Sequence, residues 1–165
     1  MSKEIRLVPL DSRFLFPYYK NFTENVTRYQ MADPFETPLE AAEYFRECKE
    51  RESAGYSIIR IIVDEDGRFI GSIEANALIG PVPCIGLWIA EEFRNKGFGS
   101  KALNLMIELL RSQGYKYDLY ETDEHNQSAI ALLNGFSCSL TNASPEILRI
   151  NDKKTLFLKK YVIRL

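Results

Sequence analysis

Residues 94–101 read Arg94-Asn95-Lys96-Gly97-Phe98-Gly99-Ser100-Lys101, and they join a predicted strand to a predicted helix. Gly97 and Gly99 lack Cβ atoms, so a ligand can approach the backbone closely there. The first N–H groups of a helix are unpaired and lie at its positive end, where they bind phosphate groups. Arg94, Lys96 and Lys101 add positive charge. We therefore expect residues 94–100 to bind a phosphate or pyrophosphate, and a tight turn that needs glycine for its own geometry is the alternative.

Strand and helix patterns alternate on either side of this stretch. Before it, the runs 56–63 and 68–75 flank Asp64-Glu65-Asp66-Gly67, a turn typical of a β-hairpin, and residues 84–90 form a third strand. After it, apolar periodicity predicts a helix over 102–110 that stops at Gly114. The remaining pattern predicts a strand at 115–121, a short helix at 126–133 and strands at 135–140 and 154–165.

The N-terminal part reads as one strand and two helical segments. Residues 5–8 form the strand, and an aromatic-rich helix is expected from Asp11 to about Glu24. Thr37 with Glu40 is a capping box at the start of the next helix, which ends at Gly55. The expected apolar stripe of this helix consists of Leu39, Ala41, Ala42, Phe45 and Cys48.

These elements predict an α/β (α+β) fold in a single domain over residues 1–165. Its sheet is mixed but mostly antiparallel, with about six or seven strands, one βαβ crossover and about four flanking helices.

Composition excludes several classes of protein. The chain of 165 residues has 21 Lys and Arg against 23 Asp and Glu, without the basic excess that nucleic-acid binding needs. The longest uncharged stretch, 75–90, contains Gly80 and two prolines and is too short to span a bilayer, and the start has no apolar signal core. Three cysteines without a CxxC pair and the single His125 predict reduced thiols and no metal site. We expect a cytoplasmic protein that binds neither nucleic acid nor membrane.

Two common phosphate-binding motifs do not explain residues 94–101. The P-loop pattern of nucleotide hydrolases is absent. Gly97-x-Gly99-x-x-Ala102 satisfies the dinucleotide-binding string, and Glu121 falls near the ribose-binding distance. In dinucleotide folds, however, the first glycine directly follows the strand of an N-terminal βαβ unit, whereas a hairpin and several intervening residues come first here.

The stretch instead resembles motif A of the GNAT superfamily of N-acetyltransferases, R/Q-x-x-G-x-G/A, as Arg94-x-x-Gly97-x-Gly99. A second block, 126–136, resembles the family's following motif, in which an asparagine opens a short helix that ends in Gly-Phe. The resemblance is strongest from Ile58 to Phe136. The N-terminal part is similar to the branch that contains ribosomal-protein N-terminal acetyltransferases and small-molecule amine acetyltransferases.

The resemblance implies that acetyl-coenzyme A (acetyl-CoA) is the cosubstrate, bound where two central strands splay apart. It implies pantetheine binding at the backbone of Ile89, pyrophosphate binding over residues 94–100, and a cofactor contact at Asn126. The implied cofactor-binding residues are Ile89, Arg94, Asn95, Lys96, Gly97, Phe98, Gly99, Ser100 and Asn126. Two positions depart from the pattern, since Leu133 replaces a frequent tyrosine and Cys84 replaces a glutamate of some relatives.

Acetyl transfer to an amine requires removal of the ammonium proton, and Glu74 is the first candidate base. Period-2 alternation puts Ser72, Glu74 and Asn76 on one strand face and Phe69, Gly71, Ile73 and Ala75 on the other. A solvent-facing polar surface is the alternative for Glu74. Tyr120 is a candidate general acid, with a packed strand tyrosine as its alternative.

The first 45 residues hold nine aromatic side chains, which we expect to be mostly core. A few of them, with Glu24, Asp33 and Glu36, could line a cavity for a cationic acceptor.

Together these features predict a metal-free N-acetyltransferase that acts on a primary amine, either a protein N-terminus or a small molecule, as a monomer or homodimer. The alternative is a non-catalytic module that binds or senses acyl-CoA, which the missing motif tyrosine keeps open. A dinucleotide-binding domain is the third hypothesis.

Overall fold

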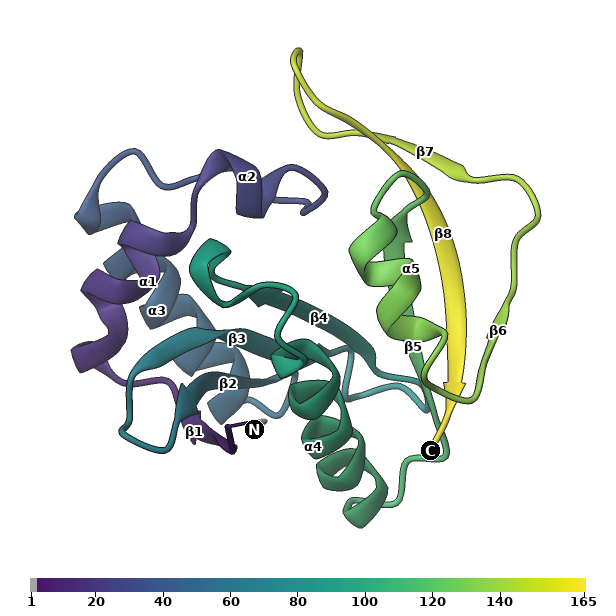
Figure 1. The fold of residues 1–165 in the computed structure, drawn as a ribbon, viewed down its shortest axis with the longest axis horizontal. Helices are drawn as coiled ribbons and strands as arrows, with labels where there is room; N and C mark the ends of the chain where they lie inside the picture. Colours follow the sequence, from purple (N-terminus) through teal and green to yellow (C-terminus); the bar gives the residue numbers. More distant parts are fainter. Residues whose placement is uncertain (1–2) are drawn as a thin grey trace.

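The computed structural model describes residues 3–165 and contains, within them, one eight-stranded sheet and five α-helices (Figure 1). The strands are β1 (Ile5–Pro9), β2 (Ile58–Asp64), β3 (Phe69–Asn76), β4 (Cys84–Ile89), β5 (Tyr117–Asp123), β6 (Cys138–Leu140), β7 (Glu146–Arg149) and β8 (Thr155–Arg164). The helices are α1 (Leu15–Asn21), α2 (Glu24–Thr27), α3 (Pro38–Ser53), α4 (Phe98–Ser112) and α5 (Gln127–Leu133), with 3-10 turns at Ser12–Phe14 and Glu91–Phe93.

The strand order is β1-β2-β3-β4-β5-β8-β6, and β7 pairs with the N-terminal half of β8. All neighbours are antiparallel except β4 and β5, which are parallel and joined by α4. The predicted mixed sheet with one βαβ crossover is therefore confirmed, with more strands and helices than expected.

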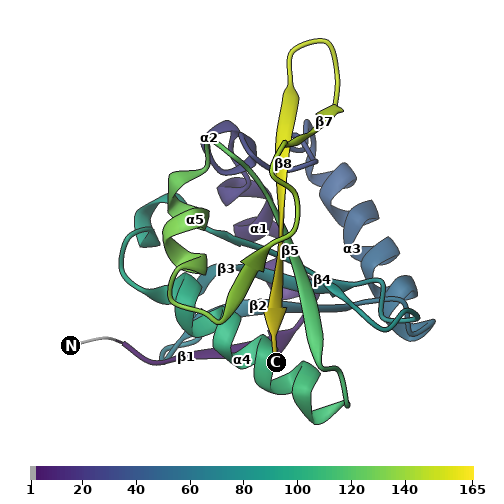
Figure 2. The same cartoon turned by 90° about the vertical axis from the view of Figure 1, so that its right-hand side faces the viewer.

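Helices cover both faces of the sheet (Figures 1 and 2). On one face, α4 and α5 pack over a core that includes Ile73, Met106 and Tyr120. On the other face, α1 and α3 enclose a second core of aromatic side chains around Tyr18 and Trp88. Each face of β3 and β4 therefore contacts apolar side chains, and the site described below lies where β4 meets β5. No helix within residues 3–165 combines the length and apolarity that crossing a bilayer requires.

The capped helix forms as predicted, with one exception. Thr37 Oγ1 accepts a hydrogen bond from the Glu40 N–H at 3.3 Å, and the Glu40 carboxylate accepts one from the Glu36 N–H at 2.8 Å. The buried stripe consists of Ala41, Phe45 and Cys48. Leu39 is 74% exposed, so its assignment to the stripe is wrong: two residues before Ala41, it points about 160° away around the helix.

A β-bulge changes the predicted face of Phe69. Ile62 pairs with Gly71 but Val63 pairs with Phe69, so Ile70 is an extra residue in β3. Phe69 consequently lies on the aromatic side, 5.6 Å from the Trp88 ring and 6.1 Å from the Tyr18 ring. The expectation that it shares a face with Ile73 is wrong because strict alternation fails at the bulge.

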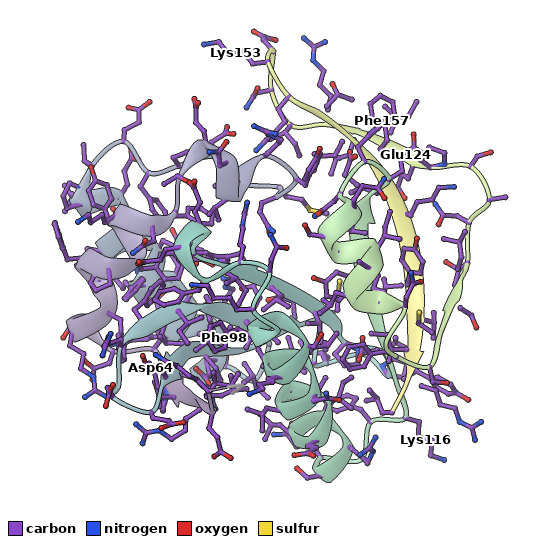
Figure 3. All side chains as sticks on the ribbon, in the orientation of Figure 1. Asp64, Phe98, Lys116, Glu124, Lys153 and Phe157 are labelled. Atoms are coloured by element: carbon purple, nitrogen blue, oxygen red, sulfur yellow. The ribbon has the colours of Figure 1, made fainter. Side chains whose placement is uncertain are left out.

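Two further differences explain the larger count of elements. The helix expected from Asp11 to about Glu24 is broken, because Phe22 has a non-helical ψ of 67° and Thr23 caps a new helix by accepting from the Val26 N–H. Strand β7 was not expected, and it pairs with β8 in a hairpin whose tip carries Lys153 (Figure 3).

Candidate active site

Strands β4 and β5 separate soon after they begin to pair. Their ladder contains only Cys84 opposite Leu119 and Ile85 opposite Tyr120. Beyond Ile85 the edge of β4 is open, and a cleft of about 1170 Å³ extends from this split to both neighbouring layers of helices. The splayed strands expected from the resemblance are present.

The open edge of β4 presents backbone groups of Leu87 and Ile89. Trp88 directs its carbonyl toward β3, where a Cβ on Gly71 would lie 2.2 Å from it. Since alternate residues of a strand bond to opposite sides, Leu87 and Ile89 direct their N–H and C=O groups into the split. Their carbonyls accept hydrogen bonds from Gln30 Nε2 and Arg94 Nε, each at 3.3 Å. The ladder with β5 ends at Ile85, so their N–H groups have no strand partner among residues 3–165 and face the cleft.

The glycine-rich turn leaves the start of α4 open. Gly97 is the N-cap residue with a φ of 82°, a left-handed conformation that favours glycine, and no side chain caps the helix. The first turn of α4 contains no acidic residue. The N–H groups of Phe98, Gly99 and Ser100 are therefore available to an anion at the positive end of a 15-residue helix.

Most of the predicted cofactor-binding residues line this one cleft. They are Ile89, Arg94, Asn95, Gly97, Phe98, Gly99, Ser100 and Asn126. Phe98 contributes mainly from the core, since its side chain is buried where α4 begins (Figure 3). Lys96 does not line the cleft, because its ammonium group donates to the Glu92 carbonyl at 2.7 Å. Lys101 likewise turns away and donates to the Lys3 carbonyl.

The turn is also connected to the N-terminal helices. Arg94 Nη2 donates to the Asn25 carbonyl at 3.3 Å, and Glu91 accepts hydrogen bonds from Thr23 and Asn25. These two hydrogen bonds to the Glu91 carboxylate lower its pKa. Residues 23–30 thus bridge the glycine-rich turn and, through Gln30, the open edge of β4.

Glu74 lies inside the cleft rather than on a solvent-facing strand surface. It is half-buried and lines the cleft on β3, directly opposite Gly86 of β4. Glu121 of β5 also lines the cleft, and the parallel register gives it the same face as Gly86. Neither carboxylate forms an ion pair within residues 3–165. Two carboxylates therefore flank a strand position that has no side chain.

Tyr120 lines the cleft from the opposite face of β5. Its side chain is 5% exposed, and burial raises its pKa, with further contributions from Cys84 and Asp118. Burial, Glu121 and Asp118 likewise raise the pKa of the Cys84 thiol to about 12. Both groups are protonated at neutral pH, so Tyr120 carries a proton, which its raised pKa holds more tightly than a free tyrosine would, and Cys84 is not a thiolate.

Asn126 caps α5, with its Oδ1 accepting from the Ala129 N–H at 3.2 Å. The neighbouring Asp123 is buried, yet its pKa is lowered, because hydrogen bonds from the Phe157 and His125 N–H groups outweigh the effect of burial. His125 Nδ1 donates to the same carboxylate, and His125 lines the cleft. These residues hold the start of α5 at the edge of the cleft.

The part of the cleft on the side of the N-terminal helices, called the acceptor side below, combines aromatic and charged residues. Not all of them were predicted from the sequence. Tyr18, Phe22, Tyr29 and Tyr44 line it, as expected for a few of the N-terminal aromatics. Glu24, Asp33 and Glu36 do not line it, and Asp33 is paired with Lys154 at 2.8 Å. Gln30, Arg51, Gly86 and Trp88 were not predicted, and Glu121 was considered only as a ribose-binding residue of dinucleotide folds. Strand alternation could have placed Glu121 beside Gly86.

Comparison with known proteins agrees with this geometry. The sequence model of the acetyltransferase (GNAT) family matches residues 20–136, which include both segments that carry the predicted resemblance. No curated protein sequence matches the chain.

Several solved structures share the fold. Spermidine N-acetyltransferase from Vibrio cholerae, in complex with CoA and spermine, is 18% identical. The match covers 97% of this chain and 95% of that protein's chain, with a TM-score of 0.83. An acetyltransferase from Salmonella typhimurium that modifies the N-terminal serine of a 50S ribosomal subunit protein is 15% identical, with coverages of 100% and 96% and a TM-score of 0.86. The microcin C7 self-immunity acetyltransferase, in complex with acetyl-CoA and AMP, is 16% identical, with coverages of 98% and 93% and a TM-score of 0.85.

Proposed function

Because the chain belongs to the GNAT family of acetyltransferases, we propose that it transfers the acetyl group of acetyl-CoA to a primary amine by direct attack on the thioester. The acceptor in this proposal is a small molecule or a protein N-terminus, and the enzyme works without a metal ion. Cytoplasmic location, a single domain over residues 1–165, and a monomeric or homodimeric state stay predictions from the sequence.

The observation that carries the proposal is the open edge of β4 beside the uncapped start of α4. Pantetheine contains amide groups that can pair with the backbone of Leu87 and Ile89, and a pyrophosphate fits the N–H groups of residues 98–100. The cleft of about 1170 Å³ joins these two features without interruption. The residues present therefore fit acetyl-CoA.

The proposed reaction converts an ammonium and a thioester into an amide, a thiol and one released proton. Glu74, directly or through water, takes the proton that makes the amine nucleophilic, and the amine attacks the acetyl carbonyl. One unpaired N–H of this edge, near Ile89, stabilises the oxyanion of the tetrahedral intermediate, while the other backbone groups pair with pantetheine. The positively charged nitrogen of the intermediate loses its second proton to solvent and the C–S bond breaks. Tyr120 donates a proton to the departing thiolate and is reprotonated from solvent. Tyr120 acts as the general acid in place of the motif tyrosine, whose position is taken by the buried Leu133.

A non-catalytic acyl-CoA sensor would need the same cofactor groove but no acceptor site. The half-buried Glu74 and the continuation of the cleft beyond it favour the enzyme. The deciding experiment incubates the protein with acetyl-CoA and a panel of amines and measures free thiol and acetylated product. Thiol release that depends on the amine supports the transferase. Binding of acetyl-CoA in calorimetry without thiol release for any amine supports the sensor.

A further inference from the structure

One guanidinium on the acceptor side has no carboxylate partner. Arg51 lines the cleft near the C-terminal end of α3, and its Nη2 lies 3.3 Å from the Cys48 sulfur. Tyr44, Cys48 and Arg51 are about one helical turn apart, so they share one face of α3. Within residues 3–165, Arg51 forms no ion pair.

Arg51 is exposed, and the side chain that it touches carries no opposite charge. Burial raises the pKa of the Cys48 thiol, even though Tyr44 and Arg51 act in the opposite direction. Burial also raises the pKa of Tyr44, with smaller contributions from Tyr18 and Glu74. Both groups are therefore neutral at neutral pH, and the guanidinium keeps a full positive charge at the wall of the cleft.

An opposite charge faces the same space. Glu74 attracts Arg51 electrostatically, but the two side chains form no ion pair. Asn76, two residues after Glu74 on the same face of β3, lines the cleft as well, and it also borders a small depression shared with Arg51. A carboxylate and a guanidinium that line one cavity without contact leave room for a ligand that carries both complementary charges.

We propose that the acceptor is a zwitterion whose amine lies at Glu74 and whose carboxylate, or comparable acidic group, lies at Arg51. This inference rests on the proposed function and specifies its substrate class. A guanidinium binds a carboxylate through paired, charge-assisted hydrogen bonds. A polyamine would instead place a second cation against Arg51, which forms no ion pair within residues 3–165. Amino acids and short peptides with a free carboxylate have the required pair of charges.

Two series of acceptors test the inference. One contains unbranched ω-amino acids of increasing length, the other contains diamines of matched length, and α-amino acids are assayed as well. Thiol release gives kcat and KM for each. We expect the best amino acid to exceed its matched diamine by at least roughly tenfold in kcat/KM. Arg51→Met should abolish this preference mainly by raising KM, because Arg51 binds the end of the acceptor that does not react. Arg51→Lys should retain part of it, and Arg51→Glu should reverse it in favour of diamines.

Arg46→Met is the matched control, because Arg46 lies on the same helix but pairs with Glu43 and Glu50 outside the cleft. It should leave the preference unchanged. A wild-type preference for diamines, or a preference for amino acids that survives in Arg51→Met, would overturn the zwitterion while amine-dependent thiol release still supported the transferase. Absence of thiol release with every acceptor would refute both the proposed function and this inference.

Discussion

Glu74 and Gly86 face each other across the β3–β4 ladder, and a Cβ at position 86 would lie 3.2 Å from Glu74 Oε1. The missing side chain thus creates the space that the Glu74 carboxylate occupies. On the far side of Gly86, where β4 and β5 part, lies the open end of the split. A base placed here is next to the backbone edge that would hold the thioester. The glycine opposite Glu74 therefore leaves room for a base beside the proposed reaction centre.

Replacement of Glu74 by Gln tests its assignment as the base. The amide keeps the shape and hydrogen bonding of the side chain but cannot accept the ammonium proton, so turnover near neutral pH should fall by roughly 10²- to 10⁴-fold. The loss should shrink as the pH approaches the pKa of the acceptor amine, because the amine then deprotonates in water. The measurement is a pH profile of kcat/KM for both proteins.

The matched control for Glu74→Gln is Glu121→Gln, which removes the other unpaired carboxylate beside Gly86. Equal affinity of all three proteins for acetyl-CoA would confine the effect to catalysis. Full activity of Glu74→Gln would eliminate Glu74 as the base, and a loss only in Glu121→Gln would transfer the role to β5. A loss in Glu74→Gln that does not change with pH would indicate a positioning role.

Gly97→Asp should abolish acetyl-CoA binding. It places a negative charge at the start of α4, where the pyrophosphate is expected, and calorimetry measures the loss. Gly67→Asp is the control for backbone strain, because Gly67 has a φ of 80° against 82° for Gly97, and a Cβ at either position meets no atom within 4 Å. The control should bind normally at a comparable cost in stability. Equal affinity of Gly97→Asp and the wild-type protein would remove this turn from the cofactor site.

Much of the fold could be predicted because its signals are local. The Asp66-Gly67 turn, the Thr37 capping box and the periodicity of α4 each depend on neighbouring residues. The position of Phe69 could not be predicted, because the bulge that turns it is a property of the pairing between two strands. Strand β7 was missed for a related reason: its partner β8 supplies the ladder, and three of its four residues are exposed.

The candidate site divides in the same way. Residues 94–100 form a continuous segment with a characteristic spacing, so their common location, apart from that of Lys96, could be predicted. The acceptor side is assembled from α1, α3, β3 and β5, and the sequence does not reveal which side chains of these elements meet. Arg51 and Glu121 show the difficulty, because each is an ordinary surface residue by sequence and becomes notable only through the cavity they share.

Asn126→Ser separates cofactor binding from helix capping. Asn126 already accepts a hydrogen bond from the Ala129 N–H, and serine can do the same, so stability should change by less than the roughly 1 kcal/mol of a lost cap. If the amide also contacts acetyl-CoA, the affinity measured by calorimetry should fall while the thermal midpoint stays. Unchanged affinity in Asn126→Ser would limit the residue to its capping role.

Asp118 should make the protein less stable as the pH rises through neutrality. Its side chain is fully buried on β5, neither carboxyl oxygen has a hydrogen-bond partner among residues 3–165, and burial raises its pKa to about 7.

A carboxyl group whose pKa is higher in the folded than in the unfolded state favours folding at low pH. This contribution is complete below the unfolded pKa near 3.8 and disappears as the pH passes about 7. A shift of this size corresponds to about 4 kcal/mol. Urea unfolding at several values between pH 4 and 8.5 should therefore show stability that declines up to about pH 7 and is then constant, and Asp118→Asn, which cannot ionise, should lack this decline. Parallel pH dependence in the wild-type and Asp118→Asn proteins would show that Asp118 does not ionise within the core in this range.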